Sequence, residues 1–165
     1  MGETLIDPLV FLDNTVLSNF ALIGCPDLIF SLWSGIACTT RQVMQEYQAG
    51  VKISRLPAEA WEDLPVYELT DAEIAKATEL PSQLGAGERT CLAAAIQRQG
   101  VFASDDQQAR KYALQIGLIV IGSIGILVRC VKKGLISKMD AQALLDRMIA
   151  ENYHSPITNL DEILD

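Results

Sequence analysis

The sequence contains a single histidine, His154, among its 165 residues. Catalytic Ser-His-Asp triads and Cys-His pairs need an imidazole as proton acceptor, so either arrangement would have to use this residue. His154 lies in the polar stretch ENYHSP close to the C-terminus, which favours a surface loop over a catalytic position. The scarcity of histidine therefore points to chemistry carried by other side chains.

Paired cysteines are also absent. The chain has no CxxC motif and no cysteine beside a histidine, because its four cysteines are widely separated: Cys25, Cys38, Cys91 and Cys130. Zinc sites and disulfide frameworks show closer or patterned spacing. We therefore expect four reduced thiols that pack as small apolar side chains.

Positive charge is in short supply. Thirteen Lys and Arg stand against 21 Asp and Glu, which gives a formal net charge of −8. A protein that binds nucleic acid by charge alone carries an excess of basic residues, so this balance argues against a simple electrostatic DNA binder. It does not exclude a nuclease whose carboxylates are neutralised by bound divalent cations.

Long hydrophobic runs are missing too. The most apolar segment, residues 116–128, has 13 residues that include three glycines, whereas a membrane-spanning helix needs about 20. Residues 1–8 lack the basic start and apolar core of a signal peptide. These features predict a cytoplasmic protein without a membrane partner. Half of the residues are hydrophobic, which suits a single folded domain over residues 1–165.

Short apolar strands alternate with helices along the chain. The apolar runs predict five strands, at residues 9–12, 36–38, 64–69, 101–103 and 118–121. Pro65 moves the third of these toward an edge of the sheet. Helical spacing and capping residues predict helices at about 16–24, 41–50, 71–79, 88–100, 107–116, 124–134 and 138–151. This alternation predicts an α/β fold with three layers, α/β/α, around a central parallel sheet of about five short strands.

Acidic side chains follow two of these strands where each strand ends. Asp13 comes directly after the first strand, and Asp105 and Asp106 follow the strand at 101–103. The carboxyl ends of parallel strands meet at one edge of the sheet, where open α/β folds bind ligands. Two helical acids can reach the same region. Glu46 flanks the buried stripe of its helix, and Glu88 occupies the first turn of another.

Spacing alone leaves two interpretations of these acids open. A cluster of carboxylates without Lys or His repels itself unless a cation is bound, and oxygen ligands suit Mg²⁺ or Mn²⁺. Such a cation activates water for attack on a phosphodiester. Alternatively, short acids at strand ends cap the backbone N–H groups of the next helix, and helical acids are mostly solvated. Thr15 and Ser104 equally suit caps and turns.

Four segments, in this order, resemble the PIN-domain nucleases: FLDNT, TTRQVMQEYQAG, LGAGERTCLAAA and FASDDQQARKYALQIG. The sequence is most similar to the VapC-like toxin ribonucleases and to relatives with a GE motif before an alanine-rich helix. The resemblance covers residues 9 to about 135. It implies a PIN-like fold in which four acidic residues surround a magnesium or manganese site and cut RNA.

The resemblance also implies a role for individual residues. Carried over by motif, the four catalytic and metal-binding acids are Asp13, Glu46, Glu88 and Asp106. The fourth follows a Thr-x-Asp pattern in the family. Here Ser104 replaces the threonine and Asp105 adds a second acid, so Asp105 is an alternative ligand. Arg110, one turn further, resembles a family arginine that can contact phosphate, and Ser104 and Thr15 are further candidates for substrate binding.

The resemblance predicts a metal-dependent endoribonuclease that uses a metal-activated water, with RNA as substrate. It further implies a homodimer and, for toxin members, a small antitoxin protein. Two other classes stay open. A magnesium-dependent phosphatase of the haloacid-dehalogenase type also begins with an apolar strand that ends in Asp, but needs a second acid two residues later, where this chain has Thr15. A non-catalytic PIN-like binding domain would act through its surface.

Overall fold

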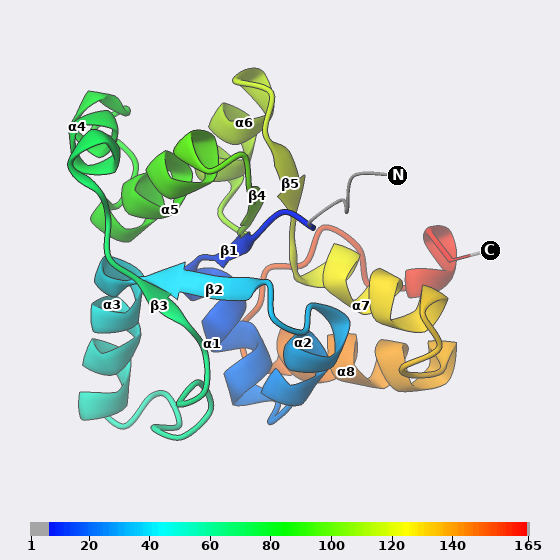
Figure 1. Ribbon diagram of the computed structural model, residues 1–165. Coiled ribbons are helices and arrows are strands. Elements are labelled where there is room, and N and C mark those ends of the chain that lie inside the picture. Colours follow the sequence, from blue (N-terminus) through cyan, green and yellow to red (C-terminus); the bar gives the residue numbers. More distant parts are fainter. Residues whose placement is uncertain (1–6, 165) are drawn as a thin grey trace, which may run out of the picture.

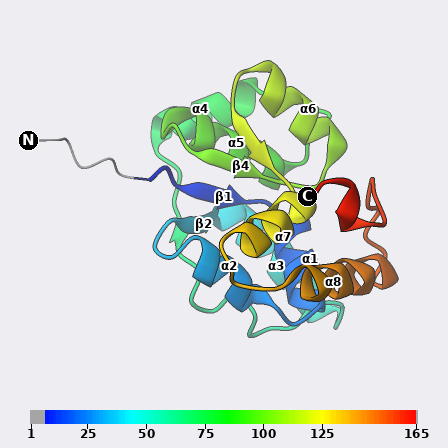
Figure 2. The same ribbon diagram turned by 90° about the vertical axis from the view of Figure 1, so that its right-hand side faces the viewer.

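The computed structural model describes residues 7–164, in which a parallel five-stranded sheet lies between two layers of helices (Figures 1 and 2). The strand order is β3-β2-β1-β4-β5, and every neighbouring pair is parallel. The strands are β1 (Val10–Leu12), β2 (Ala37–Thr40), β3 (Val66–Tyr67), β4 (Val101–Ala103) and β5 (Ile119–Ile121). The predicted three-layer α/β/α fold is confirmed.

The helices cover both faces of the sheet. One face carries α1 (Asn14–Leu22), α2 (Pro26–Leu32), α3 (Arg41–Lys52), α7 (Ser123–Lys132) and α8 (Lys138–Ala150). The other face carries α4 (Asp71–Glu79), α5 (Ala86–Gln97) and α6 (Gln107–Gln115). The chain crosses to the other side of β1 after β3, and its helices change face at the same point and change back after β5. A short 3₁₀ helix, η1 (Leu160–Glu162), follows α8.

The core lies on both faces of the two central strands. The side chains of Phe11, Leu12 and Phe102 are fully buried, as expected for strands covered by helices on both sides. Helix α5 crosses the sheet with a run of buried residues, Cys91–Ala95, all of them small except Leu92. Three of the four cysteines are buried, all four are free thiols, and the prediction of reduced, packed cysteines is confirmed.

The long connection between α3 and β3 is irregular and is anchored by Trp61. This side chain is 3% exposed, and its indole N–H donates to the carbonyl oxygen of Leu17 in α1 at 3.0 Å. The predicted edge strand around Pro65 shortens to the two residues of β3. Helix α2 was not predicted, since its seven residues carry only a proline start and a short apolar segment as signals.

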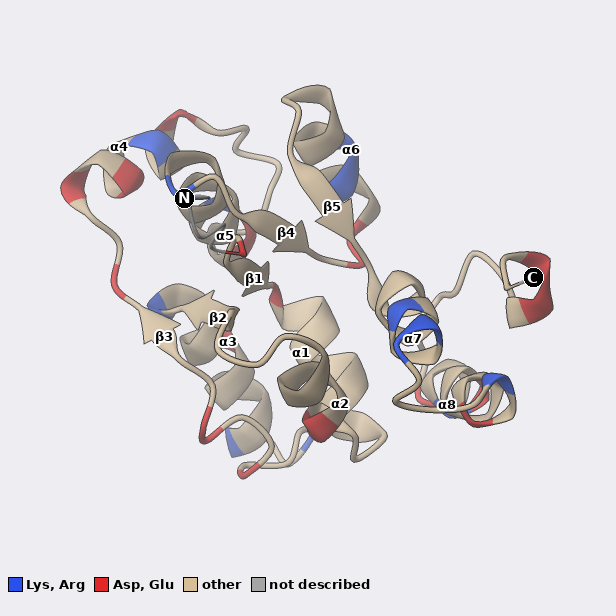
Figure 3. Cartoon of the chain, turned by 45° about the vertical axis from the view of Figure 1, so that its right-hand side comes forward, with Lys and Arg blue, Asp and Glu red and all other residues tan. Residues whose placement is uncertain are grey.

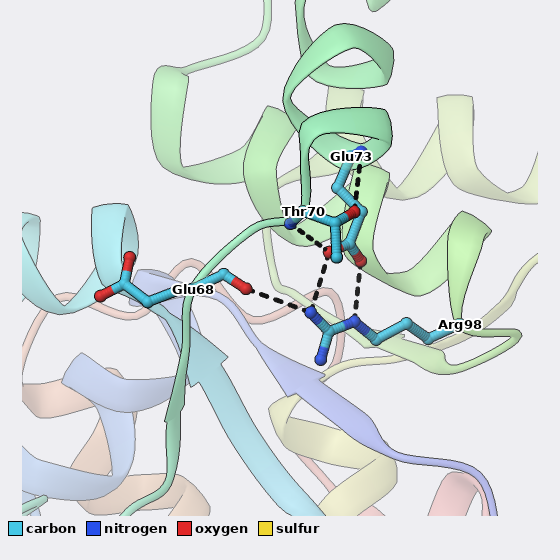
Figure 4. A network of polar contacts seen from close by, with 4 residues as sticks. All are labelled: Glu68, Thr70, Glu73 and Arg98. Atoms are coloured by element: carbon cyan, nitrogen blue, oxygen red, sulfur yellow. Dashed lines mark hydrogen bonds and ion pairs between the residues drawn. The ribbon is translucent and has the colours of Figure 1, made fainter.

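An ion pair joins α4 to the end of α5 (Figure 4). Arg98 donates from Nε and Nη2 to the two carboxylate oxygens of Glu73, both at 2.8 Å. Its Nη2 also donates to the carbonyl oxygen of Glu68, and its guanidinium lies 4.8 Å from the ring centroid of Tyr67. The Glu73 side chain is 1% exposed, and its bonds with Arg98 hold the pKa of this carboxyl below its usual range.

Within residues 7–164, no single helix is long and apolar enough to cross a membrane, and only α1 and α2 taken together, bent by 119°, reach the length and hydropathy of a span. The predictions made for residues 1–8 lie mostly outside the described residues. His154 is exposed in the loop after α8, as its sequence context predicted.

Candidate active site

The register of β1 with β4 brings two polar side chains together at the carboxyl edge of the sheet. Leu12 pairs with Ala103, so the next residues of the two strands, Asp13 and Ser104, leave the sheet side by side. The hydroxyl of Ser104 donates to Asp13 Oδ2 at 2.7 Å. The candidate site is built outward from this contact.

Asp13 is a buried carboxylate, 2% exposed. It is the N-cap of α1, where Oδ1 accepts from the N–H of Asn14 at 2.7 Å. Burial raises the pKa of Asp13 to about 7. The hydrogen bond from Ser104 opposes this rise, while the negative charges of Glu88 and Glu46 add to it. Asp13 is therefore both a cap and a member of an acidic group, so the two interpretations of its sequence position are compatible.

Glu46 reaches from α3 to the first turn of α5. Its Oε1 accepts from the N–H of Gly87 at 2.9 Å. A Cβ atom at position 87 would lie 2.7 Å from both Oε1 and Cδ of Glu46, closer than such atoms approach. The glycine of the GE motif thus lets a carboxylate from another helix contact the backbone of α5.

Glu88 is the third residue of α5, and its Oε2 accepts from the N–H of the N-cap residue Gly85 at 2.9 Å. Burial raises the pKa of Glu88. The bond from Gly85 opposes this rise, and the charges of Asp106 and Glu46 add to it. These couplings join four acids in one electrostatic group, since Asp13 is coupled to Glu88 and Glu46, and Glu88 is coupled to Asp106.

The neighbouring acids Asp105 and Asp106 have different surroundings. Asp106 is the N-cap of α6, where Oδ1 accepts from the N–H of Ala109 at 2.8 Å. Its own N–H donates to Ser104 Oγ at 3.1 Å. The carboxylate of Asp105 instead links α1, α7 and the residues after α8, 151–164, which we call the C-terminal segment. It accepts hydrogen bonds from Asn19 Nδ2, from the N–H and hydroxyl of Ser123, and from the hydroxyl of Tyr153.

The other predicted site residues lie around Ser104. Thr15 Oγ1 accepts from the N–H of Asp105 at 2.9 Å and donates to Asp13 Oδ2 at 3.4 Å. Arg110 Nη1 donates to the carbonyl oxygen of Ser104 at 2.9 Å. The sequence reasoning missed the partners of Asp105, which are Asn19, Ser123 and Tyr153. Single polar residues on three distant segments give no sequence signal of a shared contact.

The negative charge of the four acids is not balanced by basic side chains. None of the ion pairs within residues 7–164 includes Asp13, Glu46, Glu88 or Asp106. The hydrogen bonds to Glu46, Glu88 and Asp106 each use a single carboxylate oxygen, so each group keeps a second oxygen for a ligand. Oxygen donors without a protein counter-ion fit a hard divalent cation such as Mg²⁺ or Mn²⁺.

In the described part of the chain, no three His, Cys, Asp or Glu side chains already stand close enough to form a preformed metal site. The carboxylates are held instead by the backbone N–H groups at the starts of α1, α5 and α6.

Comparison with known families identifies the fold. A family model described as a PIN domain matches residues 9–165. The chain belongs to the PIN-domain family. PIN domains are generally nucleases and typically use divalent metals, which agrees with the uncompensated acids of this one. The match continues beyond the predicted limit near residue 135 and includes α8 and the C-terminal segment of this PIN domain. No curated protein matches the sequence.

Proposed function

We propose that this PIN domain is a divalent-metal-dependent endoribonuclease. In this proposal, the residues that hold Mg²⁺ or Mn²⁺ are Asp13, Glu46, Glu88 and Asp106. One observation carries it: Asp13, Glu46, Glu88 and Asp106 form no ion pair within residues 7–164, and negative charges within this set raise the pKa values of Asp13 and Glu88. Structural carboxylates are normally paired with a cation or a hydrogen-bonded network that neutralises them, and Glu73 with Arg98 is such a pair in this molecule.

The chain's own residues supply orientation at this site. When bound, a divalent cation lowers the pKa of water and stabilises negative charge on the phosphoryl oxygens. Ser104 and Thr15 hold the carboxylate of Asp13 through its Oδ2, which fixes the direction of the other oxygen. Gly87 fixes Glu46. Arg110 stands beside Ser104, where the unused part of its guanidinium can bind a phosphate of the RNA.

The experiment is cleavage of an end-labelled RNA by the purified protein. EDTA should abolish cleavage, and added Mn²⁺ should restore it. Glu46→Gln and Asp106→Asn should each remove at least 99% of the rate, as expected for a lost charge at a reacting centre. Glu62→Gln is the matched control, because it makes the same charge change at an exposed loop residue. Equal cleavage by all three variants would refute the assignment of these acids.

The two alternative functions are outcomes of the same experiment. Hydrolysis of small phosphate monoesters with no cleavage of RNA would favour the phosphatase, although no observation supports it, because Thr15 occupies the position of its second acid and instead bonds to Asp13 and Asp105. RNA binding without hydrolysis under any metal would favour a non-catalytic PIN-like binding domain.

We further propose, from the family resemblance alone, a homodimer and a small antitoxin protein that covers the site. Sedimentation equilibrium of the purified chain tests the first. Inhibition of cleavage by a protein encoded beside this chain, restored by its proteolysis, tests the second. A cytoplasmic location remains a prediction.

A further inference from the structure

A cationic cleft lies beside the acidic group. Its volume is about 650 Å³, and α6, the end of β5, α7 and the C-terminal segment form its walls. Its cationic lining residues are Arg110, Arg129 and Lys132. Its one acidic lining residue, Asp105, is engaged in hydrogen bonds with Asn19, Ser123 and Tyr153. A protein of net charge −8 thus gathers positive charge in one concave place.

The cations of α7 lie on one face of the helix. Gly125, Val128, Arg129 and Lys132 line the cleft and are spaced as neighbours on a helix surface. The opposite face, with Ile126, Leu127 and Cys130, is buried in the core. Figure 3 shows basic residues gathered on α7 and on α6, on the same side of the molecule as the C-terminal segment. Neither Arg129 nor Lys132 forms an ion pair within residues 7–164.

The C-terminal segment gives the cleft ring-bearing side chains. Tyr153, His154 and Pro156 line it together with Ile157. The hydroxyl of Tyr153 donates to Asp105 Oδ1 at 3.4 Å, which restrains the ring. Proteins that bind single-stranded nucleic acid combine positive charge along the backbone with ring faces on which bases stack. This cleft offers both.

The cleft adjoins the candidate active site through Asp105 and Arg110, which line it. Arg110 lines the cleft and donates to the carbonyl oxygen of Ser104, whose hydroxyl donates to Asp13. Arg110 is thus separated from Asp13 by a single residue, Ser104, which contacts both. Gly122 permits this arrangement, because a Cβ there would lie 2.7 Å from Asp105 Oδ1 and 2.8 Å from Arg110 Nη1.

We propose that this cleft binds the single-stranded RNA that flanks the scissile bond, with Arg129 and Lys132 on its phosphates and Tyr153 against a base. The inference rests on the proposed ribonuclease function and assigns the flanking RNA a binding surface on α7 and the C-terminal segment. An acidic protein segment would also meet the cations, but it would gain nothing from the ring faces or from the connection to Asp13. The strand therefore runs from the acidic group along α7 toward the C-terminal segment.

The test measures binding separately from cleavage. Fluorescence anisotropy with a labelled single-stranded RNA of mixed sequence is recorded in EDTA, where hydrolysis cannot occur. The double variant Arg129→Ala/Lys132→Ala should weaken binding about tenfold and reduce the slope of log K against log salt by about 1.4, at 0.7 per lost phosphate contact. Tyr153→Leu should weaken binding without changing the slope. Lys133→Ala, an exposed residue of the same region that does not line the cleft, should bind as the parent protein does.

Each result decides the proposal. Equal binding by the double variant and Lys133→Ala would overturn it, as would tighter binding of poly-glutamate or duplex RNA than of the single strand. Hydrolysis of a small phosphodiester in Mn²⁺ is measured as well, because this assay tests the ribonuclease proposal without requiring RNA to bind in the cleft. Loss of RNA binding in the double variant with small-diester hydrolysis retained supports the cleft. RNA binding that depends on Arg129 and Lys132 in a protein that never hydrolyses a phosphodiester supports the cleft and refutes the ribonuclease.

Discussion

Replacing Gly87 by alanine should inactivate the protein while leaving its fold intact. The added Cβ would lie 2.7 Å from Oε1 and Cδ of Glu46, and because heavy atoms in contact stay beyond about 3.4 Å, the carboxylate must move by roughly 1 Å or rotate away. Its hydrogen bond to the N–H of residue 87, 2.9 Å long, is then lost.

The effects on activity and on stability differ in size. A displacement of about 1 Å at a catalytic group costs on the order of 10²-fold in rate, which corresponds to about 2.7 kcal/mol of transition-state stabilisation. The lost hydrogen bond costs about 1.5 kcal/mol of folding free energy. Alanine in place of glycine within a helix stabilises the folded state by about 1 kcal/mol. The free energy of unfolding should therefore change by less than about 1 kcal/mol.

Two measurements on the same preparation check this prediction. Manganese-dependent cleavage of RNA should fall about 100-fold, and urea unfolding should keep its midpoint. Gly85→Ala is the comparison, because the same Cβ would lie at an ordinary 3.6 Å from Glu88 Oε2; it should retain most of the activity. Full activity in Gly87→Ala would show that the position of Glu46 does not matter, and the reasoning about this residue would be refuted.

Three further predictions concern charge. Arg98→Met leaves the buried Glu73 carboxylate unpaired and should cost about 3 kcal/mol in urea unfolding. In the parent protein the pKa of Glu73 is lowered, so its contribution is present above pH 4.5 and is lost as the pH falls below it. Asp13→Asn keeps an N-cap residue and should abolish cleavage without loss of stability. Because the pKa of Asp13 is raised from 3.8 to about 7, the metal-free parent should lose stability as the pH rises between these values, and the variant should lose less. Asp105→Ala should destabilise by about 2 kcal/mol by leaving its donors unpaired and retain more activity per folded molecule than Asp106→Ala.

Two controls accompany these variants. Thermal melts in EDTA measure the stability of each metal-free protein, and the cleavage rate of each variant is divided by its folded fraction. If the melting temperatures of Asp13→Asn and of the parent protein change with pH in the same way between pH 4 and 8, the raised pKa of Asp13 is contradicted. A strongly destabilised Asp13→Asn would assign the residue to capping alone. Loss of cleavage in Asp105→Ala at full folded fraction, with Asp106→Ala active, would exchange the roles of these two acids.

The sequence predicted the sheet well because its strands are marked by local signals. The buried strand that ends at Leu12 is an uninterrupted apolar run followed by an acid, and the start of α4 is marked by a capping box of Thr70 with Glu73. The positions of the helices and of the carboxyl edge of the sheet followed from the alternation of strands and helices along the chain. The seven residues of α2 gave no comparable period.

The contacts between elements were beyond sequence reasoning. The flanking position of Glu46 on its helix was predicted, but its bond to Gly87 depends on how α3 docks against α5. Asp105 and Asp106 are chemically identical neighbours, and only the turn after β4 decides that one faces Ser123 and the other caps α6. The pairing of Glu73 with Arg98 likewise joins residues that are 25 positions apart.

Because β1 and β4 lie side by side, the candidate site can form only after these two strands have paired. Asp13 and Ser104 are 91 positions apart along the chain, and such distant pairings form late because a large loop must close first. A ribosome that has translated only the first hundred residues carries a polypeptide with Asp13, Glu46 and Glu88 and with β2 to pair with one edge of β1, but without β4 to pair with the other edge. A nascent chain of this length also lacks Ser104 and Asp106, so under the proposed function it should not cleave RNA.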